Sequence, residues 1–289
     1  MFYAEITRPA SVRPRRTGVP VPEETPESPV SRSWSRSTER AAAILACFSL
    51  EEPRLRVSEI AKRLGLHPSS VYRYLEALEA AYLVERDEEF GGFKPSLRIV
   101  ELSAVVLRNL EVRRQALDEM DSLRDELGLL VNLGVLRDAD VIHVAHAFPT
   151  GWPRENMDVG RPAAAHATSL GKVLLAALPL EEAVRRVLSA GWRSYTQHSI
   201  QSESALRAEL AKVAEAGHAI DDEERNIGIV CVAVPIRAAD SKVAAALSVT
   251  GRADSIRQRG TDQLAARLTK SAVRISSRMG RSPEMLAYL

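Results

Sequence analysis

Residues 57–76 read VSEIAKRLGLHPSSVYRYLE, and their spacing decides the fold of the first part of the chain. A helix-turn-helix needs a small residue where its helices cross, a residue tolerant of positive φ in the turn, and an apolar residue on the second helix that faces the first. Ala61, Gly65 and Val71 supply these three in that order. The segment therefore predicts a helix-turn-helix.

The same segment contains residues typical of helix ends. Ser58 is expected to be the N-cap of the first helix, and Gly65 its C-terminal stop. The second helix is expected from Val71 to about Ala80, with Pro68 in its first turn, where a proline is tolerated.

The flanking sequence predicts a winged version of this motif. Apolar residues at helical spacing follow Ser37 and predict an additional helix that starts there. Residues 82–84 and 93–95 flank an acidic turn that ends in two glycines, a pattern typical of a small hairpin. We therefore expect a winged helix-turn-helix DNA-binding domain over residues 37–96.

Charge supports DNA binding only when it is read locally. The chain has 289 residues with 39 Lys+Arg against 38 Asp+Glu, a formal net charge of +1, whereas DNA-binding domains are usually basic. Residues 60–75, however, contain three basic residues and no acidic one, which places positive charge where a recognition helix would meet the major groove. A winged domain that contacts a protein instead of DNA is the alternative. The expected DNA contacts are Lys62 and Lys94 to phosphates, Arg73 to guanine, and Ser69, Ser70 and Tyr72 to phosphates or bases.

The ends of the chain and its overall composition exclude several classes of protein. Residues 1–36 contain six of the fifteen prolines and almost no apolar periodicity, so we expect a disordered tail there, with a DNA-touching arm as the alternative. Residues 281–289 are expected to form a C-terminal tail. No apolar run approaches the ~20 residues of a membrane helix, and polar residues occupy the place of a signal sequence. Two cysteines are too few for a disulfide framework or a zinc cage, so a cytoplasmic protein without membrane contact is expected.

The middle of the chain predicts a linker followed by an α+β domain. Residues 97–111 are expected to be a linker and dimerisation helix, and its packing against its own domain is the alternative. A winged domain with so little positive charge should bind DNA weakly alone, so a dimer with recognition helices about 34 Å apart is expected.

The mixture of strands and grouped helices beyond the linker favours α+β over a doubly wound sheet. Strands are expected at 129–136, 141–147, 217–221, 229–236 and 243–250, and helices at 112–127, 168–178, 180–190, 202–216 and 261–279.

Six short stretches, in order and spacing, resemble one known family. They are SEIA at 58–61, SSVYRYL at 69–75, HATSLGK at 166–172, DDEE at 221–224, CVAVPI at 231–236 and ALSVTG at 246–251. Over roughly residues 37–280 the chain is similar to the IclR-type bacterial transcriptional regulators.

The resemblance implies a two-domain α+β protein. Its N-terminal domain would be a winged helix-turn-helix that binds double-stranded operator DNA. Its C-terminal domain, expected at 112–280, would be GAF-like, with an antiparallel sheet flanked by helices, and would bind a small effector. Homodimers or tetramers and action as a repressor, or less often an activator, are implied as well. Two features depart from the family: Ala81 stands where a glycine is frequent, and the wing ends in Phe93-Lys94-Pro95-Ser96 instead of Tyr-x-Leu-Gly.

The effector site is expected where the third and later stretches meet. The N–H groups at a helix start suit a carboxylate, and residues 168–171 open a predicted helix. The resemblance implies that the N–H groups of Ser169 and Leu170 hold an organic acid. Leu133, Met157 and Val159 are candidates for an apolar wall of this site, and a place in the core is the alternative for Leu133 and Met157. Four side chains would complete the site: Asp221, Cys231, Ser248 and Thr250.

Enzyme and metal chemistry are the remaining alternatives. Cys231 has a nucleophilic thiol, but it lies within an apolar run, where a cysteine is usually a small hydrophobic residue. His143 and His146 are metal-ligand types, but three residues apart on a regular strand they face opposite sides. We therefore expect no catalytic residue, no metal and no cofactor.

Overall fold

The structure of the protein, a computed structural model, describes residues 29–153 and 158–279, with side chains from residue 36 onward. Residues 1–28 of the predicted tail at 1–36 lie outside the described residues, as do the predicted tail at 281–289 and Met157. Residues 29–36 are helical, so the expectation that structure starts near Ser37 is wrong. The helix begins at Pro29, because a proline fits the first helical position without loss of a hydrogen bond.

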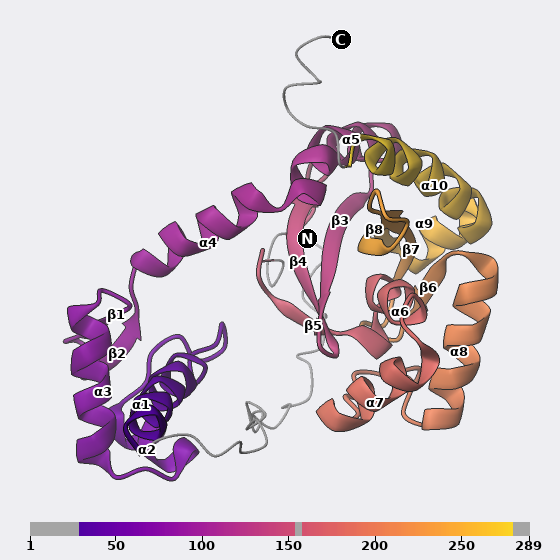
Figure 1. The fold of residues 1–289 in the computed structure, drawn as a ribbon. Helices are drawn as coiled ribbons and strands as arrows, with labels where there is room; N and C mark the ends of the chain where they lie inside the picture. Colours follow the sequence, from indigo (N-terminus) through magenta and orange to yellow (C-terminus); the bar gives the residue numbers. More distant parts are fainter. Residues whose placement is uncertain (1–28, 154–157, 280–289) are drawn as a thin grey trace. The chain divides into compact units, whose positions relative to one another are not determined.

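The described chain forms two compact units, and the division between Val106 and Leu107 falls within one helix. The N-terminal unit is a winged helix-turn-helix (Figure 1). Its hairpin has the expected antiparallel pairing, and Leu55 adds a bridge to Phe93 beside it. The elements are α1 (Pro29–Leu45), α2 (Val57–Leu64), α3 (Pro68–Ala80), β1 (Val84–Asp87) and β2 (Gly92–Pro95).

The crossing of α2 and α3 has the geometry that the spacing predicted. Ala61 and Val71 are buried, and Gly65 ends α2 at φ 63°. The N-cap of α2 is Arg56 and not Ser58, because the Glu59 side chain accepts the Arg56 N–H at 2.7 Å and fixes the first turn one residue earlier.

Two helices lead into the C-terminal unit. They are α4 (Arg98–Asn109) and α5 (Glu111–Leu127), joined at Leu110. No residue of α4 is buried within the described chain, whereas the inner face of α5 packs on the sheet that follows.

The C-terminal unit is a six-stranded antiparallel sheet with helices on both faces, and strand order β5-β4-β3-β8-β7-β6 (Figure 1). Helices α5 and α10 cover one face, and α6, α7 and α8 cover the other. The predicted α+β fold is therefore confirmed. A short strand β5, a 3-10 turn and α9 were not expected from the sequence. The elements are β3 (Leu130–Arg137), β4 (Asp140–Ala147), β5 (Pro162–Ala164), η1 (Ala165–Ala167), α6 (Ser169–Ala176), α7 (Leu180–Ala190), α8 (Glu203–Ala216), β6 (Ala219–Asp222), β7 (Ile229–Arg237), β8 (Val243–Arg252), α9 (Ala253–Arg259) and α10 (Thr261–Arg278).

Strand alternation divides this sheet into an apolar face and a partly polar face. On β8, Leu247 and Val249 point into the core under α5 and α10, so Ser248 and Thr250 point to the α6 side. Among the described helices, none has both the length and the apolar character needed to cross a membrane.

Candidate DNA-binding surface and effector pocket

The recognition helix α3 buries one face and exposes the other. Val71 and Leu75 are buried, whereas Ser69 and Arg73 are exposed and Ser70 is half-buried. Ser69 also has a local partner, because its Oγ lies 2.7 Å from Nδ1 of the N-cap residue His67. Arg73 is thus an exposed cation on the outer face of the helix.

Tyr72 contacts the wing as well as solvent. Its hydroxyl accepts a hydrogen bond from Arg86 at 3.3 Å, and the guanidinium lies 5.5 Å from the Tyr72 ring centroid. Arg86 is held in turn by Glu79, at 3.0 Å. The Tyr72 side chain therefore ties α3 to β1, and its exposed part, 37% of the residue, faces outward.

The two predicted phosphate contacts differ in their surroundings. Lys62 is exposed on α2. Lys94, on β2, is half-buried and forms an ion pair with Glu85 at 3.3 Å, which offsets part of its positive charge.

Two further arginines lie at the wing and were missed from the sequence. The guanidinium groups of Arg54 and Arg56 lie 5.3 Å and 4.3 Å from the Phe90 ring centroid. Arg54 also pairs with Asp87 at 3.6 Å. The sequence shows only two arginines at alternate positions just before α2. Nothing local in it indicates that their side chains contact the turn of the wing.

The start of α6 presents two free N–H groups. Thr168 is the N-cap, and its hydroxyl accepts the Gly171 N–H at 3.1 Å while its carbonyl accepts that of Lys172 at 2.9 Å. Within the described residues, the N–H groups of Ser169 and Leu170 have no acceptor. These are the two N–H groups that the family resemblance predicted would hold an effector carboxylate.

Gly171 lets α6 approach the preceding turn closely. A Cβ at this position would lie 2.2 Å from both the Cα and the carbonyl oxygen of Ala165, which are backbone atoms that cannot move aside independently. The glycine therefore fixes where the free N–H groups lie.

A row of polar side chains crosses five strands on the α6 face of the sheet. Strand pairing sets Asp221 opposite Cys231, and Cys231 opposite Thr250. Thr250 Oγ1 donates to Cys231 Sγ at 3.1 Å. The predicted side chains Asp221, Cys231, Ser248 and Thr250 are thus brought together.

Asn132 and His146 extend this row and were missed from the sequence. Asn132 Nδ2 donates to Thr250 Oγ1 at 3.0 Å and to Ser248 Oγ at 3.3 Å. Asn132 Oδ1 lies 2.8 Å from Nδ1 of His146. The available signal was that Asn132 is polar within an otherwise apolar strand.

The expectation that His143 and His146 face opposite sides is wrong. An irregularity in the β3–β4 pairing sets Leu133 opposite Ala145 but Gly134 opposite His143, which shifts the alternation by one residue. The two rings therefore stack with centroids 5.1 Å apart. Burial, with His146 beside it, lowers the pKa of His143 to about 4. No group of three metal-ligand side chains is present in the part of the chain that the structure describes.

Leu133 is not a wall of the pocket. It is buried in the core on the α5 and α10 face, because it alternates with Asn132 along β3. Val159 is 44% exposed. Of the two interpretations of Leu133, the core position is therefore confirmed and the pocket wall is wrong.

Charged side chains gather around a buried lysine beside the row. The Lys172 ammonium, 1% exposed, lies 2.7 Å from Glu209 and 2.5 Å from Glu224. Burial, and the nearby Glu224 carboxylate, raise the pKa of Asp221 to about 7. Burial also raises the pKa of the Cys231 thiol strongly, so the thiol is neutral and a poor nucleophile.

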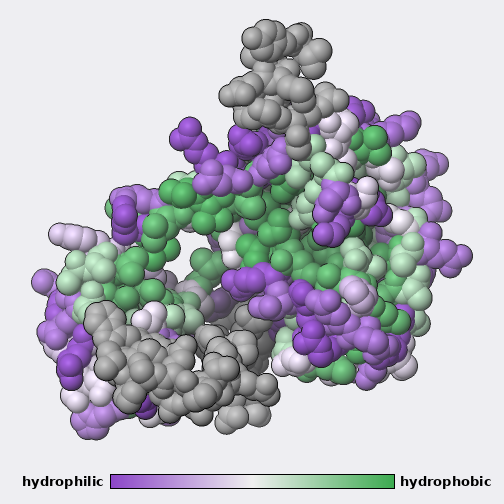
Figure 2. Space-filling view, viewed as in Figure 1, coloured by the Kyte–Doolittle hydropathy of each residue, from purple (hydrophilic) through white to green (hydrophobic). Residues whose placement is uncertain are grey.

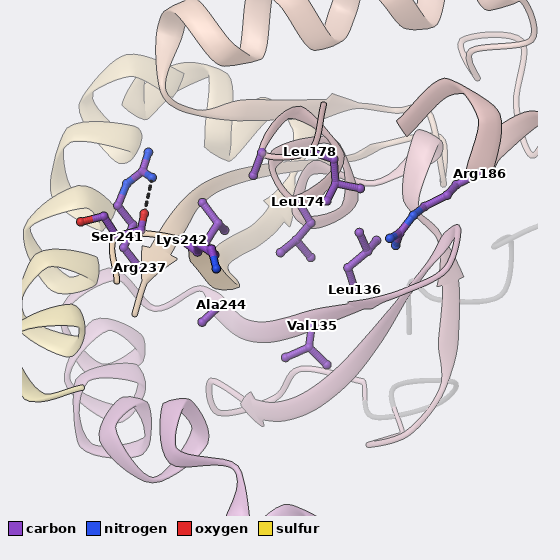
Figure 3. Close-up of a pocket in the computed structure, with 11 residues that line it drawn as sticks. Val135, Leu136, Leu174, Leu178, Arg186, Arg237, Ser241, Lys242 and Ala244 are labelled. Atoms are coloured by element: carbon purple, nitrogen blue, oxygen red, sulfur yellow. Dashed lines mark hydrogen bonds between the residues drawn. The ribbon is translucent and has the colours of Figure 1, made fainter. Parts of the chain in front are cut away.

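A separate hollow of about 560 Å³ lies at the other end of α6 (Figure 3). It opens where the β3–β8 pairing ends at Gly134 and Ala246. Leu174 of α6 and Leu178, just after this helix, form part of its lining, and Arg186, Arg237 and Lys242 lie around it. None of the predicted site residues lines this hollow.

Two family profiles match almost the whole described chain. The helix-turn-helix domain of the IclR type matches residues 37–88, and the profile described as bacterial transcriptional regulator IclR C-terminal matches residues 104–277. The fold and the matches define a transcription regulator with a DNA-binding helix-turn-helix and a C-terminal effector domain. The chain belongs to the IclR family, as its sequence motifs indicated.

Curated relatives and solved structures agree with this assignment. The chain is 30% identical over 217 residues to the HTH-type transcriptional regulator XynR of Escherichia coli, covering 74% of this chain and 85% of the relative. It is 31% identical to the glycerol operon regulatory protein of Streptomyces coelicolor, covering 78% and 88%. An IclR regulator of Alicyclobacillus acidocaldarius is similar at 28% identity and a TM-score of 0.72, covering 85% and 99%. An IclR homologue of Microbacterium hydrocarbonoxydans, solved with 4-hydroxybenzoate, has 25% identity and a TM-score of 0.71, covering 85% and 100%.

Proposed function

We propose that this protein is a cytoplasmic, ligand-responsive repressor whose C-terminal domain binds a small organic acid and thereby alters operator binding. The observation that carries the proposal is the start of α6. Two free N–H groups there lie on the side of the sheet that carries neutral hydroxyl, thiol and amide groups. Backbone N–H groups at a helix start stabilise a carboxylate, and neutral donors orient it.

The relatives support an organic acid and both signs of regulation. The Microbacterium homologue was solved with 4-hydroxybenzoate, which is an organic acid. A repressor of Escherichia coli, AllR, is 28% identical to this chain, and a transcriptional activator of Acinetobacter baylyi is 26% identical. A reporter gene behind the bound operator tests the sign: repression predicts higher expression when the regulator is deleted.

The proposed effector site consists of the N–H groups of Ser169 and Leu170 with the side chains of Asp221, Cys231, Ser248 and Thr250. A thermal-shift screen of small organic acids on the full chain tests it. A stabilising acid should lose its effect in Ser248→Ala combined with Cys231→Ala. The matched control is Ser277→Ala on α10, where the exposed hydroxyl donates to the Arg274 carbonyl. Unchanged stabilisation in the double variant would remove these side chains from the site.

The proposed DNA contacts are cations and hydroxyls of the winged unit that are exposed or half-buried. We place the DNA-binding domain at 37–96, the linker helix at 97–111 and the effector domain at 112–280. Bases would be read by Arg73, and phosphates would be bound from α2 and the wing. The residues concerned are Lys62, Ser69, Ser70, Tyr72, Arg73 and Lys94.

We propose that α4 holds two copies of the chain together as a homodimer, which can pair further into a tetramer. It exposes a series of apolar side chains that Figure 2 shows as a largely hydrophobic surface. Large exposed apolar patches mark interaction sites. Charge substitutions on this helix, such as Val105→Glu, should shift the chain toward monomer in analytical ultracentrifugation. The exposed residues are Val100 (60%), Leu102 (44%), Val105 (58%) and Val106 (60%) of α4, with Leu97 (79%) just before it.

A further inference from the structure

The Asp221 carboxyl is buried at the end of the polar row without a cation of its own. The residue is 3% exposed. Its Oδ1 accepts the backbone N–H groups of Glu224 at 2.9 Å and Arg225 at 3.3 Å, and Cys231 stands opposite it in the β6–β7 pairing. Among the described residues, no Lys or Arg side chain forms an ion pair with it.

The charges that face Asp221 do not balance an additional anion. Lys172, from α6, is a buried cation of this cluster, and it is already shared by Glu209 of α8 and Glu224. If Asp221 were ionised, three carboxylates would face one ammonium.

Neither arginine near this cluster supplies the missing charge. The Arg225 guanidinium lies on the Tyr195 ring, 4.1 Å from its centroid. Arg257 pairs with the exposed Asp222 and with Glu223, each at 2.7 Å. Burying an uncompensated carboxylate is costly, so the uncharged acid is the favoured form of Asp221.

An effector carboxylate at the start of α6 would add another negative charge to this group. Two carboxylates in one buried site cannot both ionise, and a protonated one can donate its hydrogen to the other. We propose that Asp221 is the residue that selects for a carboxylate effector. Its protonated carboxyl donates a hydrogen bond to the effector carboxylate, so that the effector binds together with one proton. This inference rests on the proposed effector site.

The proposal predicts a pH-dependent affinity. Below the pH at which Asp221 of the free chain ionises, the proton is already present and the affinity is constant. The pKa of about 7 places this limit near neutral pH. Above it, each pH unit should raise the Kd of a carboxylate about tenfold, because a proton must be taken up with the ligand. A neutral amide of the same shape needs no proton and should show no such change.

The first experiment measures binding by isothermal titration calorimetry between pH 6 and pH 9. The probes are benzoate, 4-hydroxybenzoate, pyruvate and the neutral 4-hydroxybenzamide. We expect the Kd of a bound carboxylate to rise about tenfold per unit above pH 7, with uptake of one proton seen as a dependence on buffer ionisation enthalpy. Asp221→Asn keeps a hydrogen-bond donor and should bind the same carboxylate with a Kd that does not change with pH. Asp222→Asn is the matched control, since it removes an exposed carboxylate at the next residue and should retain the wild-type pH dependence.

The second experiment needs no ligand. Urea unfolding of the full chain at each pH should show the wild type losing stability relative to Asp221→Asn as the pH rises from about 4 to about 7. Identical pH profiles for the two chains would overturn the proposal. Binding of a carboxylate at the same Kd from pH 6 to pH 9 would overturn it as well, and would leave the effector site standing. Failure of every carboxylate to bind at any pH would instead overturn the proposed function together with this inference.

Discussion

The two units of this chain present their candidate residues in opposite ways. In the winged unit, Arg73 and Lys62 are exposed, and their charges are surrounded by water. In the C-terminal unit, Lys172 and Asp221 are buried and bound to other side chains or backbone groups. A charge in water can be removed at little cost to the fold, whereas a buried one cannot. The same kind of substitution should therefore report on binding in one unit and on stability in the other.

The largest expected effect is the loss of the buried ammonium. Lys172→Met leaves Glu209 and Glu224 facing each other without a cation, which should lower the free energy of unfolding by about 3–5 kcal/mol. Urea denaturation followed by circular dichroism measures it. Lys62→Met, an exposed lysine on α2, is the matched control and should change stability by less than about 0.5 kcal/mol.

A second variant shows whether the loss comes from charge. Adding Glu224→Gln to Lys172→Met removes one unpaired carboxylate and should restore part of the stability. If the double variant is no more stable than the single one, charge pairing is not the cause of the effect.

The next effect is a pH dependence that arises from His143. Its pKa is about 4 in the folded chain, against about 6.5 when unfolded, so the unfolded state binds more protons between these values. Stability should therefore be full above pH 6.5 and fall as the pH drops toward 4, by up to about 3 kcal/mol from this group. The difference between the wild type and His143→Gln over this range measures it. Asp221 contributes with the opposite sign, but it is present in both chains, so its contribution cancels in the difference. A difference that rises as the pH falls would contradict the assignment to His143.

Removal of Arg73 should affect binding and leave the fold intact. Arg73→Ala is expected to weaken operator binding by about 1–3 kcal/mol and to relax the base preference at one position. Lys62→Ala should instead weaken binding to all sequences alike and lower the salt dependence. Fluorescence anisotropy with operator and mutated operator DNA distinguishes the two. An unchanged preference in Arg73→Ala would remove it from base reading.

How much could be predicted from the sequence follows from how local each feature is. Ala61, Gly65 and Val71 act within one short segment, so their spacing was enough to predict the helix-turn-helix. Asn132 and His146 join the polar row only through strand pairing and a bulge, neither of which leaves a local pattern. Leu133 lies in the core, the alternative to a pocket wall, for a related reason: neighbouring residues of a strand face opposite sides, so Leu133 and Asn132 cannot share a site.

The smallest expected effect concerns the residue that precedes the wing. Tyr82 has φ 59°, a left-handed backbone conformation that residues with a side chain rarely adopt, and the residue is 75% exposed. The preceding Ala81 has φ −86°, which any residue adopts. Ala81, which stands where the family often has glycine, is thus one residue before the position that needs positive φ.

Tyr82→Gly should therefore raise the stability of the winged unit, by at most about 1 kcal/mol, because the relief of strain is partly offset by the entropy of glycine in the unfolded chain. Ala81→Gly gains no such relief and should lower stability by about 0.5–1 kcal/mol. Thermal unfolding of the two variants decides the matter, and a stabilising Ala81→Gly would show that the backbone bends one residue earlier than the structure places it.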